Sequence, residues 1–282
     1  MTVPSSYTKI GAGGMLTDNQ REKHIERIQH FRYIDDVFFS VAFDGFKLGV
    51  ELILRKVLGD ESIIVEELYT QKDVINWYGR SVRFDVFAST GDKRFNCEIQ
   101  RDNSGAIPQR ARYNSSLLDA REVQKGTDYA DLPETIVIMI CEHDIFQKGL
   151  PLYHVKKIIS ETGDDFNDGS SVIYVNGQCQ EDTPLGHLMH DFFCRDANDM
   201  YDKDLAARMK YLKEDQGGVQ SMCEVMEELV REGREQGIER GKLESLVSSI
   251  RNLMKTMNLT AKQAMDALLV PPAEQEKIVT LL

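Results

Sequence analysis

Hydrophobic and polar residues alternate along residues 83–100, which read RFDVFASTGDKRFNCEIQ. A period of two, in a segment rich in aromatic and β-branched residues, predicts two half-buried β-strands. Gly91 and Asp92 lie between them and suit a two-residue type II′ turn, because glycine adopts φ > 0 at the first central position without strain. The pattern therefore predicts a β-hairpin with a fixed register.

Two carboxylates interrupt the predicted hairpin. Its register places Val86 opposite Cys97 and Asp85 opposite Glu98. Opposed side chains have Cβ atoms about 5 Å apart, so two like charges there destabilise the pair. The two acids could share a proton, lie solvated on an exposed face, or bind one divalent cation, since hard cations take carboxylate oxygens. The hairpin pattern alone leaves all three interpretations open.

The rest of the chain reads as alternating helices and strands. Apolar periodicity and turn signals predict helices at residues 18–30, 45–58, 108–124, 184–194, 199–214 and 219–256. Further strands are predicted at residues 62–68, 135–141 and 171–175. Strand 94–100, helix 108–124 and strand 135–141 make a βαβ unit, because 135–141 reads as a strand buried on both faces. A hairpin that leads into a parallel crossover predicts an α/β fold with a mixed sheet.

Four segments are expected along the chain. They are a disordered tail at 1–17, a main domain at 18–215, a long charged helix at 216–256 and a small helical hairpin at 257–282. Gly217-Gly218 is expected to break the chain before the long helix. Residues 233–241 of that helix carry glycine at every fourth position, but charged residues lie between, so self-association is expected rather than membrane packing.

Composition narrows the class of protein. The chain is 41% hydrophobic and 28% charged, as in soluble globular proteins. No run of about 18 apolar residues exists, so no membrane partner is expected. The N-terminal stretch lacks the apolar core of a secretory signal, which predicts a cytoplasmic location. Five scattered cysteines without a CxxC spacing exclude a disulfide framework and a zinc ribbon.

Two further patterns bear on ligands. His187, His190 and Cys194 could line one helical face and bind zinc, but a fourth ligand at normal spacing is missing, which favours an amphipathic helix with partly buried histidines. The net charge of −12 argues against binding nucleic acid over the whole surface. Arginines nevertheless gather locally in the segment that follows Glu98.

A third acid completes a more specific order of residues. Glu51 lies in a predicted helix, where an i, i+4 pair with Arg55 is its simplest explanation. However, Glu51 in a helix is followed by Asp85 in a strand and by Glu98-Ile99-Gln100 in the next. Long stretches support this order at residues 108–120, 125–146, 149–154, 164–177 and 182–194. Over residues 30–230 the chain resembles the PD-(D/E)XK nuclease family transposases, the group that includes recombination-promoting nucleases.

The resemblance implies a restriction-endonuclease-like mixed sheet flanked by helices, with a helical C-terminal extension. It also implies metal-dependent cleavage of phosphodiester bonds in double-stranded DNA. Asp85 and Glu98 would bind Mg²⁺, with Mn²⁺ as a substitute, and the Ile99 carbonyl would join them. Glu51 would lie near the metal, and Gln100 would take the place that lysine usually holds.

The sequence departs from the family signature at two positions. Phe84 replaces the proline before Asp85, and Gln100 can orient a water molecule but adds no positive charge. Arg101, Arg110 and Arg112 could bind DNA phosphates as bidentate donors.

Two functions from different classes follow. The first is a Mg²⁺-dependent DNA endonuclease associated with mobile elements, recombination or phage defence. The alternative is a catalytically degenerate nuclease fold that serves as a DNA-binding or protein-interaction module. The acidic net charge and Gln100 favour the alternative. The three carboxylates kept in order favour the nuclease.

Overall fold

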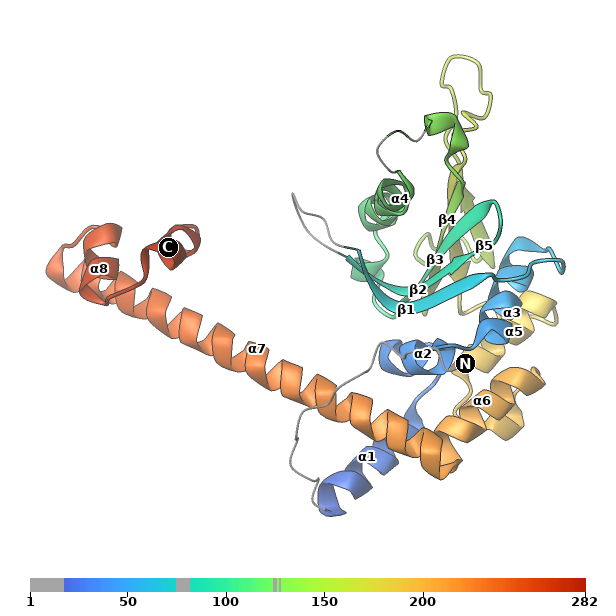
Figure 1. Ribbon diagram of the computed structural model, residues 1–282, viewed down its shortest axis with the longest axis horizontal. Helices are drawn as coiled ribbons and strands as arrows, with labels where there is room; N and C mark the ends of the chain where they lie inside the picture. Colours follow the sequence, from blue (N-terminus) through green and yellow to red (C-terminus); the bar gives the residue numbers. More distant parts are fainter. Residues whose placement is uncertain (1–17, 75–81, 124–125, 127) are drawn as a thin grey trace. The chain divides into compact units, whose positions relative to one another are not determined.

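The computed structural model describes residues 18–282 except 75–81, 124–125 and 127 (Figure 1). The predicted tail at 1–17 lies outside these residues. The strands are β1 Glu67–Val74, β2 Val82–Ser89, β3 Lys93–Gln100, β4 Glu134–Cys141, β5 Leu152–Val155 and β6 Ser170–Asn176. They form one sheet in the order β1-β2-β3-β4-β6-β5. The helices are α1 Asp18–His30, α2 Asp36–Phe43, α3 Lys47–Leu58, α4 Pro108–Glu122, α5 Pro184–Phe193, α6 Lys203–Glu214, α7 Gln216–Met257, α8 Ala261–Ala267 and α9 Pro272–Val279.

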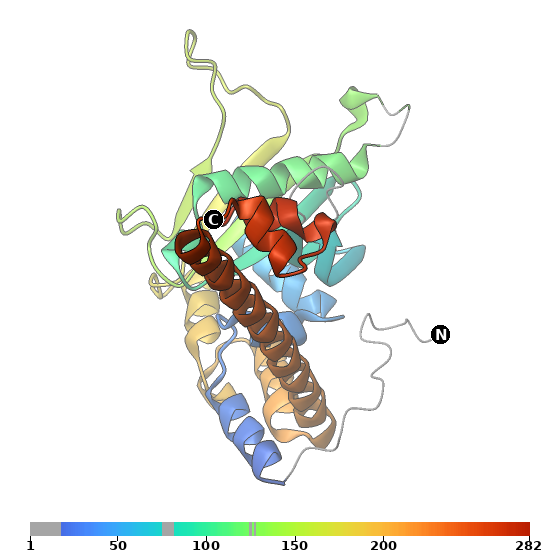
Figure 2. The ribbon, with the colours of Figure 1, turned by 90° about the vertical axis from the view of Figure 1, so that its left-hand side faces the viewer.

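The sheet is mixed, as predicted. β1, β2 and β3 are antiparallel neighbours, β3, β4 and β6 run parallel, and β5 is antiparallel to β6. Helix α4 connects β3 to β4 and packs on β3, β4 and β6; it is the green helix in Figure 2. Helix α2 contacts β1, β2 and β3, and together with α3, α5 and α6 it forms the second helical layer (Figure 1). The α/β fold and the βαβ unit are therefore confirmed.

The core beneath α4 explains why this helix binds the sheet. Its buried residues are Phe84, Phe87, Ala106, Ala111, Leu117, Leu118, Val137, Met139, Cys141 and Tyr174. Burial of apolar area at about 25 cal/mol per Å² favours this contact. The seam is nevertheless partly polar, because Asn96 of β3 and Asn114 of α4 are fully buried. The Asn114 amide has no hydrogen-bond partner among the described residues, whereas the Asn96 side chain lies close enough to the Glu98 carboxylate to lower its pKa.

The β2–β3 hairpin closes as the sequence predicts, with one exception. The Thr90 N–H donates to the Lys93 carbonyl over 3.0 Å, so the loop holds two residues. Val86 pairs with Cys97, which is the predicted register. Gly91 does not adopt the positive φ of a type II′ turn, so that part of the prediction is wrong. The turn closes without a left-handed residue, and loop length alone sets the register.

The β2–β3 ladder stops after the Val86–Cys97 pair. Beyond it, β2 continues beside β1, where Lys72 pairs with Phe84. β3 continues beside β4, where Ile99 pairs with Ile140. The edges of β2 and β3 that face each other are thus left without backbone pairing at the carboxyl end of β3. The predicted pairing of Asp85 with Glu98 would fall just beyond the last pair of this ladder, so it is not part of the observed register.

Strand β1 begins later than predicted, because side chains of α3 bind the backbone of the segment before it. The Arg55 guanidinium donates to the Ile63 carbonyl, with Nε at 2.9 Å and Nη2 at 2.6 Å. The Val65 N–H donates to Glu51 Oε1 over 2.9 Å. The strand predicted at 62–68 is therefore wrong over its first residues. The backbone groups of Ile63 and Val65 therefore bind side chains of α3. In a β-ladder they would have bound the backbone of a neighbouring strand.

Helix α2 was not predicted. Its sequence, DVFFSVAF, is apolar on nearly all sides, and residues 38–43 are all buried. A helix without a polar face gives no period of 3.6 residues to detect.

The predicted chain break at Gly217-Gly218 is also misplaced, since both glycines lie within α7. The chain turns at Asp215, which accepts the Gly217 N–H at Oδ1. A Cβ on Gly218 would collide with the Tyr211 carbonyl of α6. Glycine is needed there for the close approach of two helices, which explains the residue without a break.

The chain divides into two compact units, and the second runs from Glu224 to Leu282. Within it α8 and α9 share a core with the C-terminal part of α7, formed by Val247, Ile250, Ala264, Met265, Val270 and Ile278. The predicted capping box is present, because Thr260 and Gln263 each accept the other's backbone N–H. No helix among the described residues is long and apolar enough to cross a membrane.

Candidate active site

Asp85 lies where the β2–β3 ladder ends. Its Oδ2 accepts the backbone N–H of Ile99 over 3.0 Å, so a side chain occupies the place of the next backbone acceptor. Burial, followed by the nearby charge of Glu98, raises the pKa of Asp85 to about 8, although the Ile99 N–H opposes the rise. The two predicted carboxylates are therefore close enough for their charges to interact.

Glu98 is fully buried on β3, in the middle of the sheet. Its Oε2 accepts from Arg110 Nη2 of α4 over 3.0 Å. Burial raises the pKa of Glu98, and the Arg110 charge opposes that rise. The other oxygen, Oε1, has no hydrogen-bond partner among the described residues. A buried acceptor without a partner costs about 1–3 kcal/mol, so this oxygen is available for a ligand.

Gln100 ends β3 beside the same arginine. Its Oε1 accepts from Arg110 Nη1 over 3.4 Å, and the side chain is buried. Gly105, in the loop that leads into α4, lies against this amide, because a Cβ at that position would collide with Gln100 Oε1. The missing side chain of Gly105 thus makes room for the Gln100 carboxamide.

Asp36 is an acid near the site that sequence reasoning missed. It is the first residue of α2, and its charge contributes to the raised pKa of Asp85. Asp36 is exposed, yet the protein atoms around it partly desolvate its carboxyl and raise its pKa, while the charges of Arg101 and Arg110 oppose the rise. The sequence signal that could have identified Asp36 is an acid at a helix N-terminus, directly before a run of aromatic residues. Only the tertiary fold shows which strand that helix end approaches.

A closed ring of ion pairs surrounds this helix end. Arg32 binds Asp35 over 3.0 Å and Glu142 over 3.1 Å. Arg101 binds the same two acids, over 3.2 Å and 2.9 Å. The ring joins the start of α2 to the residues that follow β3 and β4. It therefore holds the neighbouring Asp36 at the carboxyl ends of the central strands.

The predicted role of Glu51 lacks a contact in the structure. The side chain is 10% exposed, accepts from Arg55 Nη2 over 3.0 Å and accepts the Val65 N–H. These contacts fix α3 to the segment before β1. Among the described residues, the hydrogen bonds of Glu51 go to Arg55 and Val65 and not to Asp85 or Glu98, so its place at the site stays a prediction.

The remaining predicted residues are distributed around the site. Arg101 belongs to the ion-pair ring, and Arg110 lies on Glu98 and Gln100. Arg112 is exposed on α4, on a different side of the helix from Arg110. The N–H of Ile99 binds Asp85, whereas a metal-binding role of its carbonyl stays a prediction. The structure thus gathers Asp85, Glu98, Gln100 and Arg110.

Comparison with known proteins agrees with this geometry. Residues 53–179 match the sequence model of the family described as PD-(D/E)XK nuclease family transposase. This part of the chain is similar to that family. No curated protein and no solved structure matches the chain. The predicted family resemblance is confirmed, and it supports a nuclease or transposase role.

The matched range of the PD-(D/E)XK family includes Asp85, Glu98 and Gln100 but neither Asp36 nor Glu51. Nucleases of this family generally use divalent metals, and the family implies a DNA substrate. The donor set fits such a metal, because hard cations take carboxylate oxygens. Glu98 Oε1 is a buried oxygen open to a ligand, and burial raises the pKa of both acids, so a bound cation would stabilise their charged forms.

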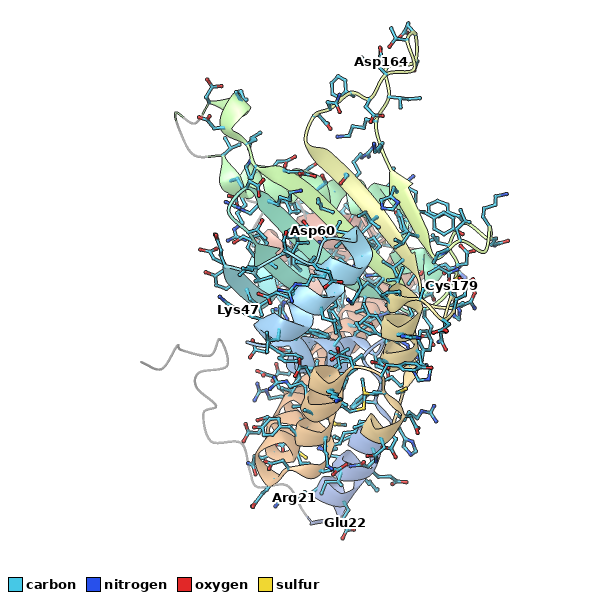
Figure 3. All side chains as sticks on the ribbon, turned by 90° about the vertical axis from the view of Figure 1, so that its right-hand side faces the viewer. Arg21, Glu22, Lys47, Asp60, Asp164 and Cys179 are labelled. Carbon is cyan, nitrogen blue, oxygen red and sulfur yellow. The ribbon has the colours of Figure 1, made fainter. Side chains whose placement is uncertain are left out.

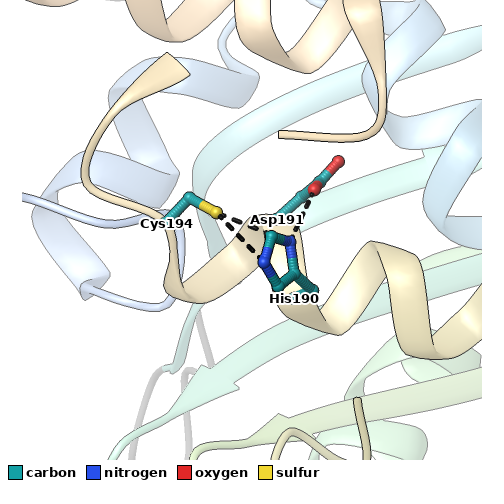
Figure 4. Close-up of side chains that lie close together, drawn as sticks. All are labelled: His190, Asp191 and Cys194. Carbon is teal, nitrogen blue, oxygen red and sulfur yellow. Dashed lines mark hydrogen bonds and ion pairs between the residues drawn. The ribbon is translucent and has the colours of Figure 1, made fainter. Parts of the chain in front are cut away.

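The histidines of α5 do not assemble the zinc site considered above. His190 Nδ1 lies 3.3 Å from Asp191 Oδ1 and 3.6 Å from Cys194 Sγ (Figure 4). His187 instead pairs with Asp182 over 2.8 Å. Both oxygens of Asp191 accept backbone N–H groups, each over 2.8 Å, in the segment that leads into α6. These bonds explain the cluster as a structural link between α5 and α6.

Proposed function

We propose that this protein is a Mg²⁺-dependent endonuclease that cleaves phosphodiester bonds of double-stranded DNA, with Mn²⁺ as a substitute metal. The observation that carries the proposal is the pair of neighbouring carboxylates, the partly buried Asp85 and the fully buried Glu98, with Glu98 Oε1 open to a ligand. Asp85 and Glu98 would hold the metal, and Asp36 would approach it from α2. A bound divalent ion supplies an activated water at neutral pH and polarises the phosphate.

The remaining residues supply orientation and charge. Gln100 lies one alternation beyond Glu98 on the same strand, so its carboxamide is placed to orient the attacking water. The positive charge that lysine would bring to position 100 comes from Arg110 of α4, which contacts both Glu98 and Gln100. Arg110 thereby places a cation where negative charge builds up in the transition state.

A plasmid-nicking assay tests the proposal. Wild-type protein is compared with Asp85→Ala and Glu98→Ala in Mg²⁺, in Mn²⁺ and in EDTA. Asp73→Ala is the matched control, because Asp73 lies on β1 and pairs with Arg83 at the surface. We expect both site variants to lose nicking and the control to keep it. Site variants that nick as fast as wild type, with the same metal dependence, would overturn the assignment.

A second candidate is a degenerate nuclease fold that binds DNA or protein without cleaving it. The net charge of −12 and the arginine that already binds Glu98 favour it. Calorimetric titration with Mg²⁺ separates the two functions, since the degenerate protein would show no binding that depends on Asp85. The family description further supports a setting in DNA mobility or recombination, and we place the activity in the cytoplasm.

A further inference from the structure

Arg110 is the cation in contact with the buried acid of the site. Its Nη2 lies 3.0 Å from Glu98 Oε2, and its Nη1 lies 3.4 Å from Gln100 Oε1. The two side chains of this ion pair differ in their exposure to solvent. The Glu98 side chain is 0% exposed and lies within the sheet, whereas the Arg110 side chain is 41% exposed. If this contact breaks, Arg110 is the partner that can move into solvent.

A divalent ion at Glu98 changes the balance of charge around Arg110. Two cations that share one buried carboxylate repel each other across a short distance, in surroundings that screen charge less than water does. The ion also takes up the negative charge that holds the guanidinium. The hydrogen bond that then remains to Arg110 is the 3.4 Å contact with the neutral Gln100, which is weak.

We propose that Arg110 is a phosphate-binding residue held in reserve, bound to Glu98 in the metal-free protein and released to the DNA backbone when a divalent ion binds. The inference rests on the proposed function, because it uses the same metal site. A guanidinium suits the task, since its planar set of donors matches two phosphate oxygens. The position of Arg110 on α4 lets a freed side chain reach a phosphate bound at Glu98 and Gln100.

This arrangement couples metal binding to DNA binding. Without metal, Arg110 is engaged inside the protein and contributes nothing to DNA affinity. With metal, the same side chain adds a charged contact, so DNA is held tightly only by protein that carries its metal. Arg112 differs, because it is exposed on α4 and lies on a different side of the helix from Arg110.

The test measures binding of a short fluorescent DNA duplex in EDTA and in Ca²⁺, with the duplex checked on a gel for cleavage. Wild type is compared with Arg110→Met and with the matched control Arg112→Met. In EDTA we expect Arg110→Met to bind as wild type does, within about twofold. In Ca²⁺ we expect it to bind about tenfold more weakly than wild type, which is the loss typical of one charged phosphate contact. Arg112→Met should show the same ratio to wild type in both conditions.

Two results would overturn the inference. Arg110→Met could weaken binding by the same factor in EDTA and in Ca²⁺, which would mean that Arg110 reaches DNA without release. It could also leave binding unchanged in both. Either result leaves the proposed nuclease intact if titration shows Ca²⁺ binding that Asp85→Ala removes. A wild-type protein that binds no Ca²⁺ refutes the metal site and the reserve role together.

Discussion

The carboxylate of Asp85 accepts the backbone N–H of Ile99 over 3.0 Å, just beyond the last backbone pair between β2 and β3. The acid therefore belongs to the sheet itself and is held by a strand neighbour. Glu98 lies next to Ile99 on that same neighbour, so one local interruption of the ladder brings both acids together. Positions set by a sheet are more exact than positions set by loops, which suits a metal site.

Replacing Asp85 by Asn should stabilise the metal-free protein at alkaline pH. Its pKa rises from 3.8 to about 8 on folding, so the folded state binds the proton more tightly than the unfolded chain. Stability from this group is present at acid pH and is lost as pH rises through about 8. Asparagine stays neutral and can still accept the Ile99 N–H.

The expected result is a melting temperature about 3 °C or more above wild type at pH 9 in EDTA, with a smaller difference at pH 5. Thermal denaturation at the two pH values checks it. An equal difference at both would show that the charge of Asp85 is not what destabilises the protein.

Substitutions of Asp36 and Glu51 should affect different properties, metal binding for Asp36 and stability for Glu51. We expect Asp36→Asn to weaken metal binding about 10-fold to 100-fold with little change in stability, because its charge adds to the site without a packing role. Glu51→Gln should instead cost about 1–3 kcal/mol of stability, because it weakens bonds to Arg55 and Val65. Metal titration and urea denaturation of both variants give the comparison. Loss of metal affinity in a fully stable Glu51→Gln would restore Glu51 to the site.

Gln100→Lys should keep nicking or raise it only a few-fold. The new amine would lie beside Arg110, and the two like charges would repel. The same substitution should raise nicking more strongly in an Arg110→Met background, where it supplies the positive charge that Arg110 no longer provides. The four proteins form a double-mutant cycle of nicking rates. Equal effects of Gln100→Lys in both backgrounds would show that the two positions act independently.

Gly105→Ala should slow nicking about tenfold or more, since a Cβ there collides with Gln100 Oε1 and displaces the carboxamide. Gly91→Ala is the control, because the nearest atom to its added Cβ is the Glu66 side chain at 3.7 Å. Both variants are assayed for nicking and for melting temperature. Wild-type nicking by Gly105→Ala would mean that the orientation of Gln100 does not matter for the reaction.

The parts of the fold that local pattern controls were predictable. The hairpin register follows from alternation and a two-residue loop, and the βαβ unit follows from Pro108, an apolar strand and the helix between. The end of the β2–β3 ladder was not predictable. It depends on Asp85 binding the Ile99 N–H, and a strand pattern gives no sign of where a side chain replaces a backbone acceptor.

The residues of the candidate site also differ in whether the sequence predicts them. The hairpin pattern and the family resemblance both predict Asp85, Glu98 and Gln100, because these residues lie close together in sequence. Asp36 comes from a distant helix with no polar face, and only the packing of α2 against β1, β2 and β3 brings it near. Glu51 shows the opposite case, since its sequence position suggests chemistry while its contacts hold the segment before β1.

The parallel run of β3, β4 and β6 has a consequence for protein engineering. Their carboxyl ends, at Gln100, Cys141 and Asn176, share one edge of the sheet, and the Gly177 N–H donates to the Cys141 carbonyl over 2.8 Å across that edge. Each of these strands is followed there by a separate connection. The long connection through Asp164 joins β5 to the opposite end of β6 (Figure 3). Under the proposed function, loops grafted after β6 would change the surface beside the site without altering Asp85 or Glu98.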